Sequence, residues 1–114
     1  SETTLNSLKS LFLDTITLVE DVFGEKAFWL LRQRKGGWGW LERSTTTVYD
    51  PMMFVMSTHL DQAAIIRERA HLFQEYIETF YQENYEVFEG RNVNPSALIA
   101  RETKLEEFFS KIIS

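Results

Sequence analysis

The stretch that decides the fold is QAAIIRERAHLFQEYIETFYQE, residues 62–83. Its apolar side chains recur at steps of three and four, which is the spacing of one face of an α-helix. The pattern predicts one long helix over 62–83, capped by Asp61. Because the apolar stripe is shorter than three heptads, it favours a packed bundle helix over a free coiled coil. The side chains predicted to face the core are Ala63, Ile66, Ala70, Phe73, Ile77 and Phe80.

Another helix is expected over residues 4–23. Apolar side chains again recur every three or four positions, and Gly24 follows where a helix is expected to stop. If this whole face is buried, Phe12→Ala and Phe73→Ala should each cost roughly 3–5 kcal/mol. The predicted core face consists of Leu5, Leu8, Phe12, Ile16, Val19 and Phe23.

Two further helices are marked by an acid or amide followed by proline. At the start of such a helix the side chain of the acid or amide accepts hydrogen bonds from the free amides of the first turn, and proline loses no hydrogen bond at the first helical position. One helix is expected to open at Asp50-Pro51, and its methionine-rich sequence is apolar nearly all round, as in a buried central helix. The last is expected to open at Asn94-Pro95 and to run over about residues 95–113.

Composition agrees with a folded helical domain. The 114 residues are 44% hydrophobic and 14% aromatic, which excludes a disordered chain and allows a phenylalanine-rich core. The chain has no cysteine and two histidines, so no disulfide, metal site or cofactor is expected. It has neither a signal peptide nor an apolar run of about 18 residues, so we expect a cytoplasmic protein without a membrane segment. We predict one all-α domain over residues 1–114, a four-helix bundle-like fold with a Gly/Trp-rich loop, Gly36–Trp40, between the first two helices.

The region between the first two predicted helices is the candidate binding site. Residues 26–43 carry a net charge of +4 while the whole chain carries −5, so the remainder carries −9. Cations that neutralise phosphates, beside rings that stack on bases, are typical of a surface for single-stranded or flexible nucleic acid. Alternatively, the tryptophans seal the end of the bundle while the cations stay solvated or dock an acidic neighbour. The candidate nucleic-acid or partner contacts are Arg32, Arg34, Lys35, Trp38, Trp40 and Arg43.

Two short motifs have the spacing of catalytic sites without the rest of the site. Glu68-x-x-His71 matches one di-iron ligand pair, but the other histidine, His59, belongs to no second pair. Glu102-x-Lys104 matches half of a nuclease motif, yet side chains two positions apart on a helix point about 200° apart. We therefore predict no catalytic residue in this chain.

From Phe23-Gly24-Glu25-Lys26-Ala27-Phe28 onward the chain resembles the helical region of the GmrSD-type restriction family. In that family a ParB/sulfiredoxin-like nuclease domain precedes the helical region. The shared features are a helix ending in this motif, a short arginine-containing stretch, and a methionine-rich helix that begins near Asp50. The matching residues are Phe12, Val22, Phe23, Gly24, Ala27, Phe28, Arg43, Val48, Tyr49, Asp50 and Met53. Arg101 and the last two predicted helices fit the end of the same region.

The family's Asp-Gly-Gln-Gln-Arg stretch has no counterpart here, nor has a His-Asn-His nuclease, and Thr46 or Thr47 stands where the family commonly has Asn. The resemblance implies a non-catalytic C-terminal fragment of a phage-defence protein, which packs on a missing N-terminal domain of the same polypeptide. It would hold DNA or a partner subunit through the basic loop. Such a fragment is expected to expose an apolar patch and to self-associate. Two alternatives are a stand-alone helical dimerisation module, which forms a homo-oligomer, and a small nucleic-acid-binding domain that uses the loop.

Overall fold

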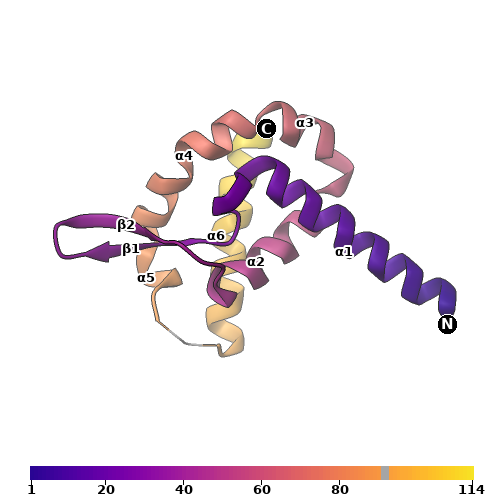
Figure 1. The fold of residues 1–114 in the computed structure, drawn as a ribbon, viewed down its shortest axis with the longest axis horizontal. Helices are drawn as coiled ribbons and strands as arrows, with labels where there is room; N and C mark the ends of the chain where they lie inside the picture. Colours follow the sequence, from indigo (N-terminus) through magenta and orange to yellow (C-terminus); the bar gives the residue numbers. More distant parts are fainter. Residues whose placement is uncertain (91–92) are drawn as a thin grey trace.

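The computed structural model describes residues 1–90 and 93–114. The chain extends 50 Å along its longest axis, against 32 and 24 Å along the others, because two elements project from a helical body (Figure 1). One is the first half of α1, and the other is a β-hairpin at the opposite end of the molecule. Two 3₁₀ turns, Gly24–Lys26 and Leu60–Gln62, join elements. The helices and strands are α1 (Glu2–Phe23), β1 (Leu30–Arg34), β2 (Gly37–Leu41), α2 (Thr46–Ser57), α3 (Ala63–Glu68), α4 (Ala70–Glu83), α5 (Tyr85–Phe88) and α6 (Pro95–Ile113).

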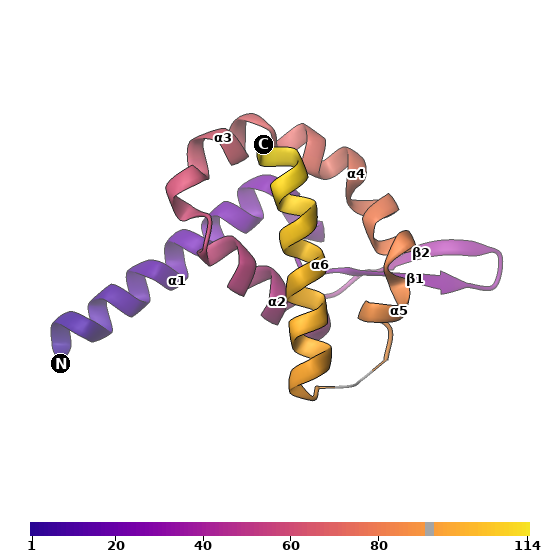
Figure 2. The same ribbon diagram turned by 180° about the vertical axis from the view of Figure 1, so that it is seen from behind.

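The predicted all-α, four-helix bundle-like fold is wrong. The part of the chain that the structure describes contains six helices and a two-stranded antiparallel sheet, and the sheet stands where a Gly/Trp-rich loop was predicted. Glycine disfavours a helix by about 1 kcal/mol each, but in a strand the alternation Gly-Trp-Gly-Trp places both tryptophans on one face. The helices also run in several directions instead of side by side: in Figure 2, α6 is upright and α1 is oblique.

Residues 62–83 form two helices where one was predicted. α3 and α4 meet at Arg69, whose backbone (φ −100°, ψ 15°) leaves the helical region. The Arg69 guanidinium Nη1 donates to the carbonyl oxygens of Ile112 and Ile113, at 2.7 and 2.6 Å, and so caps the end of α6. Despite the bend, the stripe still faces inward. The predicted core positions confirmed as buried are Ile66, Phe73, Ile77 and Phe80.

The centre of the core is a cluster of aromatic rings from three helices. Phe73 of α4 packs edge-to-face against Phe23 of α1, with ring centroids 5.9 Å apart. It meets Phe108 and Phe109 of α6 in the same way, at 5.9 and 5.2 Å. α2 adds Met52, which is fully buried, to the hydrophobic core that includes these rings. The phenylalanine-rich core expected from composition is therefore present.

α1 begins at Glu2, two residues before the predicted start, and ends where its sequence predicts. Ser1 accepts a hydrogen bond from the Thr4 amide at 3.3 Å, and Gly24, at φ +61°, ends the helix as predicted. The predicted burial of the whole apolar face is wrong, because the first half of the helix extends beyond the body. Buried side chains begin at Thr15, whereas Leu5, Leu8 and Phe12 are exposed.

Of the two helices predicted from a proline near their start, one begins where it was predicted and the other does not. α6 begins as predicted, with the Asn94 side chain accepting from the Ala97 amide at 2.9 Å. α2 begins at Thr46, one turn before the predicted start, and carries Pro51 inside it. The earlier start follows from tertiary contact, because the amide of Thr45 donates to the Phe28 carbonyl at 3.0 Å. Among the described residues, no helix has both the length and the apolar character needed to cross a membrane.

Candidate functional site

Five of the six candidate residues, all but Arg43, lie on a short hairpin with a two-residue turn. β1 and β2 pair from Leu30 opposite Leu41 to Arg34 opposite Gly37, which leaves Lys35 and Gly36 as the turn. Gly36 has φ +100° and Gly37 has φ +133°, conformations that glycine adopts without the strain of a side chain. These two glycines therefore set both the turn and the pairing of the strands.

The pairing separates the cations from the tryptophans. Residues directly opposite each other in an antiparallel pair share a face, and neighbours along a strand alternate. Arg32 pairs with Gly39 and Arg34 with Gly37, so both arginines lie opposite glycine on one face, which we call the arginine face. The tryptophans lie on the other face, where Gln33 pairs with Trp38 and Leu31 with Trp40.

The tryptophan face attaches the hairpin to the helical body. Trp38 meets the ring of Tyr85 edge-on at 5.5 Å, and Trp40 meets Tyr81 in the same way at 6.0 Å. The Trp40 indole Nε1 also donates to a Glu78 carboxylate oxygen at 3.1 Å, and the Lys26 ammonium lies 5.3 Å from the Trp40 ring centre. These contacts hold Trp40 against the helical body, whereas Trp38 stays partly exposed.

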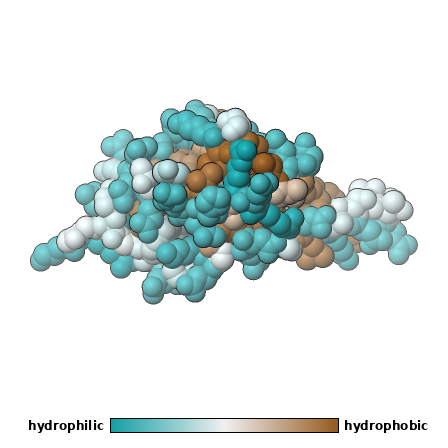
Figure 3. Space-filling view, turned by 90° about the horizontal axis from the view of Figure 1, so that it is seen from above, coloured by the Kyte–Doolittle hydropathy of each residue, from teal (hydrophilic) through white to brown (hydrophobic). Residues whose placement is uncertain are grey.

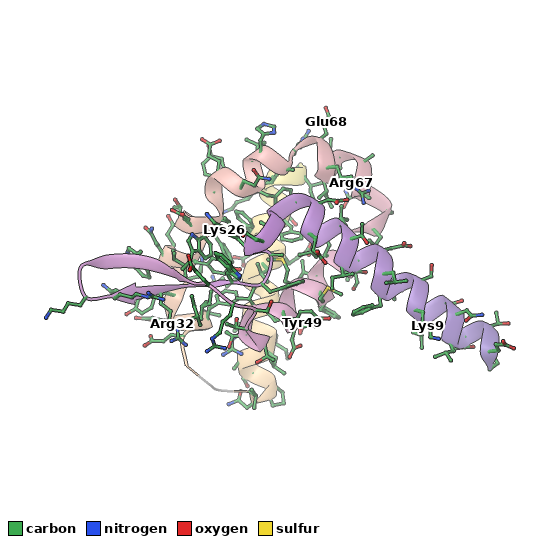
Figure 4. All side chains as sticks on the ribbon, in the orientation of Figure 1. Lys9, Lys26, Arg32, Tyr49, Arg67 and Glu68 are labelled. Atoms are coloured by element: carbon green, nitrogen blue, oxygen red, sulfur yellow. The ribbon has the colours of Figure 1, made fainter. Side chains whose placement is uncertain are left out.

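The arginine face is open to solvent. The labelled Arg32 extends from the hairpin on the side away from Lys26 (Figure 4). The Arg34 side chain lies along Gly39, where an added Cβ would stand 3.5 Å from the arginine Cδ, and its Nη2 donates to the Trp40 carbonyl at 3.1 Å. Arg43 follows β2 and is also exposed. Within residues 1–90 and 93–114, no carboxylate lies within 4.0 Å of the cations of Arg32, Arg34, Lys35 or Arg43.

A histidine in the body forms a polar contact that sequence analysis missed. His59 Nε2 lies 2.7 Å from Glu106 Oε2, and Nδ1 lies 2.7 Å from Gln62 Oε1. Burial lowers the pKa of His59, but the hydrogen bonds to Gln62 and Glu106 and the nearby negative charges outweigh it, so the pKa lies above 6.5. Since Glu106 is 47 positions away along the chain, no local pattern could have predicted the pair. The contact links the end of α2 to α6.

Arg101, which the resemblance singled out without a role, is a cation almost completely enclosed by the fold. It is 2% exposed, and its Nε donates to the Val87 carbonyl at 3.0 Å. Burial lowers its pKa. This bond joins α6 to α5, the short helix on which the hairpin packs through Tyr85. Arg101 therefore supports the hairpin indirectly.

The Glu68-x-x-His71 motif lies on the surface of the helical body. His71 is exposed on α4, and Glu68 lies at the end of α3. In the described part of the chain, no three His, Asp or Glu side chains gather closely enough to hold a metal ion. Comparison of the chain with family models, curated proteins and solved structures finds no match.

Proposed function

We propose that this chain is a non-catalytic helical interaction domain that binds the phosphate backbone of nucleic acid through the arginine face of its hairpin. The observation that supports this function is the exposed pair of arginines, Arg32 and Arg34, each opposite a glycine and, among the described residues, neither with a carboxylate within 4.0 Å of its guanidinium nitrogens. Because glycine has no side chain, the guanidinium groups can approach a flat or convex partner without obstruction.

The dimensions and charge of the hairpin suit a nucleic-acid groove. A two-stranded ribbon fits the major groove of duplex DNA, which is about 12 Å wide. Lys35 at the tip adds a third cation to those of the arginine face. The remainder of the chain is strongly acidic, so nucleic acid is repelled from the body and directed to the hairpin. Phosphate contact, rather than base stacking on tryptophan, is the mode that this arrangement supports.

The resemblance to the GmrSD-type restriction family supplies a biological setting for this binding. In that setting the domain is cytoplasmic, packs on an N-terminal nuclease domain of the same polypeptide, and helps to hold DNA. The proposed setting predicts an open reading frame that extends upstream of Ser1 and encodes an Asp-Gly-Gln-Gln-Arg stretch. A frame that starts near Ser1 contradicts the setting but leaves the hairpin proposal standing.

The binding proposal is tested by fluorescence anisotropy with labelled duplex and single-stranded DNA at several salt concentrations. With two to three phosphates contacted, the logarithm of the association constant should fall with the logarithm of salt at a slope of about −2 to −3. Arg32→Glu/Arg34→Glu should weaken binding at least about tenfold. The matched control Lys104→Glu/Lys111→Glu makes the same charge change on α6 and should weaken it much less. No binding at low salt, or equal loss in both variants, contradicts the proposal.

A further inference from the structure

The first half of α1 carries a stripe of apolar side chains that are exposed to solvent. Figures 1 and 2 show this part of the helix, which we call the arm (residues 1–14), leaving the body. Figure 3 shows hydrophobic side chains gathered on α1 where it leaves the body. At 3.6 residues per turn these side chains share a stripe about 120° wide. They are Leu5 (52% exposed), Leu8 (58%), Leu11 (44%) and Phe12 (47%), whereas Leu13 (58%) is exposed outside the stripe.

The same stripe is buried in the second half of the helix. Continuing along the face, the next positions include Leu18, Val19 and Val22, all fully buried against the body. α1 packs there on α2, α3 and α4. One continuous face is therefore covered over half its length and uncovered over the other half.

The arm has little helical stability of its own. An isolated helix of fewer than about 12–15 residues is marginal in water, and the arm is of this length, although the packed second half of α1 supplies its nucleation. The arm also contains Thr3, Asn6, Ser7 and Ser10, which are weak helix formers. A partner that covers the stripe would supply the missing stabilisation.

We propose that a second copy of this chain covers the stripe, with the two arms packed antiparallel about a two-fold axis near Leu8. In a parallel pair the shared face would run on into the second half of both helices, where each chain's own body already covers it. In an antiparallel pair each arm overlaps only the other arm, and the two bodies lie at opposite ends. Leu5 of one copy then packs beside Leu11 and Phe12 of the other.

The area agrees with a specific dimer. The four exposed side chains leave about 370 Å² of apolar surface, if a whole leucine offers roughly 180 Å² and a phenylalanine roughly 200 Å². Two copies thus offer about 740 Å². Since roughly 65% of a homodimer interface is apolar, the pair buries at most about 1,140 Å² in total, which exceeds the roughly 1,000 Å² that a biological interface needs and is enough for a weak but specific dimer. This inference does not depend on nucleic-acid binding by the hairpin.

Sedimentation equilibrium of the 114-residue chain, from micromolar to millimolar concentration, tests the proposal. The expected mass at the upper end is twice 13.4 kDa. Leu8→Glu/Phe12→Glu places two charges in the stripe and should weaken association at least about tenfold, which corresponds to 1.4 kcal/mol. Asn6→Glu/Ser10→Glu adds the same charges on the opposite face and should leave the dimer intact. Circular dichroism should show that both variants keep a folded body.

Disulfide cross-linking tests the direction of the arms, because the chain has no natural cysteine. Leu8→Cys should form a linked dimer, and Ser10→Cys should not. Thr4→Cys should link to Phe12→Cys in a mixed sample but not to itself. A monomer at every concentration, a dimer that tolerates Leu8→Glu/Phe12→Glu, or efficient linking of Thr4→Cys to itself would each overturn the proposal.

Discussion

Phe73→Ala should be among the most destabilising single substitutions in this chain. The side chain is fully buried and touches rings from α1 and α6, so it joins three helices at one point. Removing the ring loses the burial of roughly 150 Å² of apolar surface, which costs about 3–4 kcal/mol at 25 cal/mol per Å². The cavity and the lost edge-to-face contacts raise the cost to about 4–5 kcal/mol.

A loss of this size is large for a domain of 114 residues, whose free energy of unfolding is expected to be roughly 6–17 kcal/mol. Urea denaturation followed by far-ultraviolet circular dichroism measures it. With a slope of about 2 kcal/mol per molar, the midpoint should fall by about 2 M urea. Phe54→Ala is the matched control, because Phe54 is 55% exposed on α2, and it should cost less than about 1 kcal/mol. Equal midpoint shifts for the two variants would refute the assignment of Phe73 to the core.

Three other predictions concern the polar contacts and the turn. The pKa of His59 is raised in the folded state, so its contribution to stability is full below pH 6.5 and is lost as the pH rises through the raised pKa. Glu106→Gln should therefore flatten the dependence of the melting temperature on pH, which thermal melts at several pH values measure. Arg101→Ala should lower the free energy of unfolding by about 2–4 kcal/mol, measured by urea denaturation, through lost packing and an unpaired carbonyl. Gly37→Ala should destabilise the hairpin by about 1–2 kcal/mol, because the residue has a positive φ, and this should be seen as faster amide exchange in β2. Gly39→Ala should not, because the added Cβ would make only ordinary van der Waals contacts.

Much of the helical framework could be predicted because its signals are local. Gly24 ends α1 and Asn94 caps α6, and both residues act through backbone groups within one turn of themselves. The inward stripe of α4 is also local, since 3.6-residue periodicity fixes which side chains share a face. These features did not need knowledge of what lies on the other side of the core.

The errors arose where tertiary contacts compete with a local pattern. The stripe of α1 has the same period in both halves, yet Phe12 is exposed and Val19 is buried, because only the second half reaches the body. The break between α3 and α4 follows from the attachment of Arg69 to the end of α6, which is more than 40 positions away. Periodicity shows which side chains share a face but not how far along the helix that face is covered.

The sequence predicted which region holds the candidate residues, but the arrangement of their side chains depends on the register of the hairpin. With the observed two-residue turn at Lys35 and Gly36, the arginines lie opposite glycines and the tryptophans lie on the other face. A three-residue turn, one position longer, would pair Arg32 with Trp40 and Arg34 with Trp38, and would create the mixed cation–aromatic surface that composition suggested. Both turns are compatible with a run of two glycines. The one-residue difference, decided by the backbone of Gly36 and Gly37, therefore separates a mixed surface of cations and rings from one on which the arginines lie apart from the tryptophans.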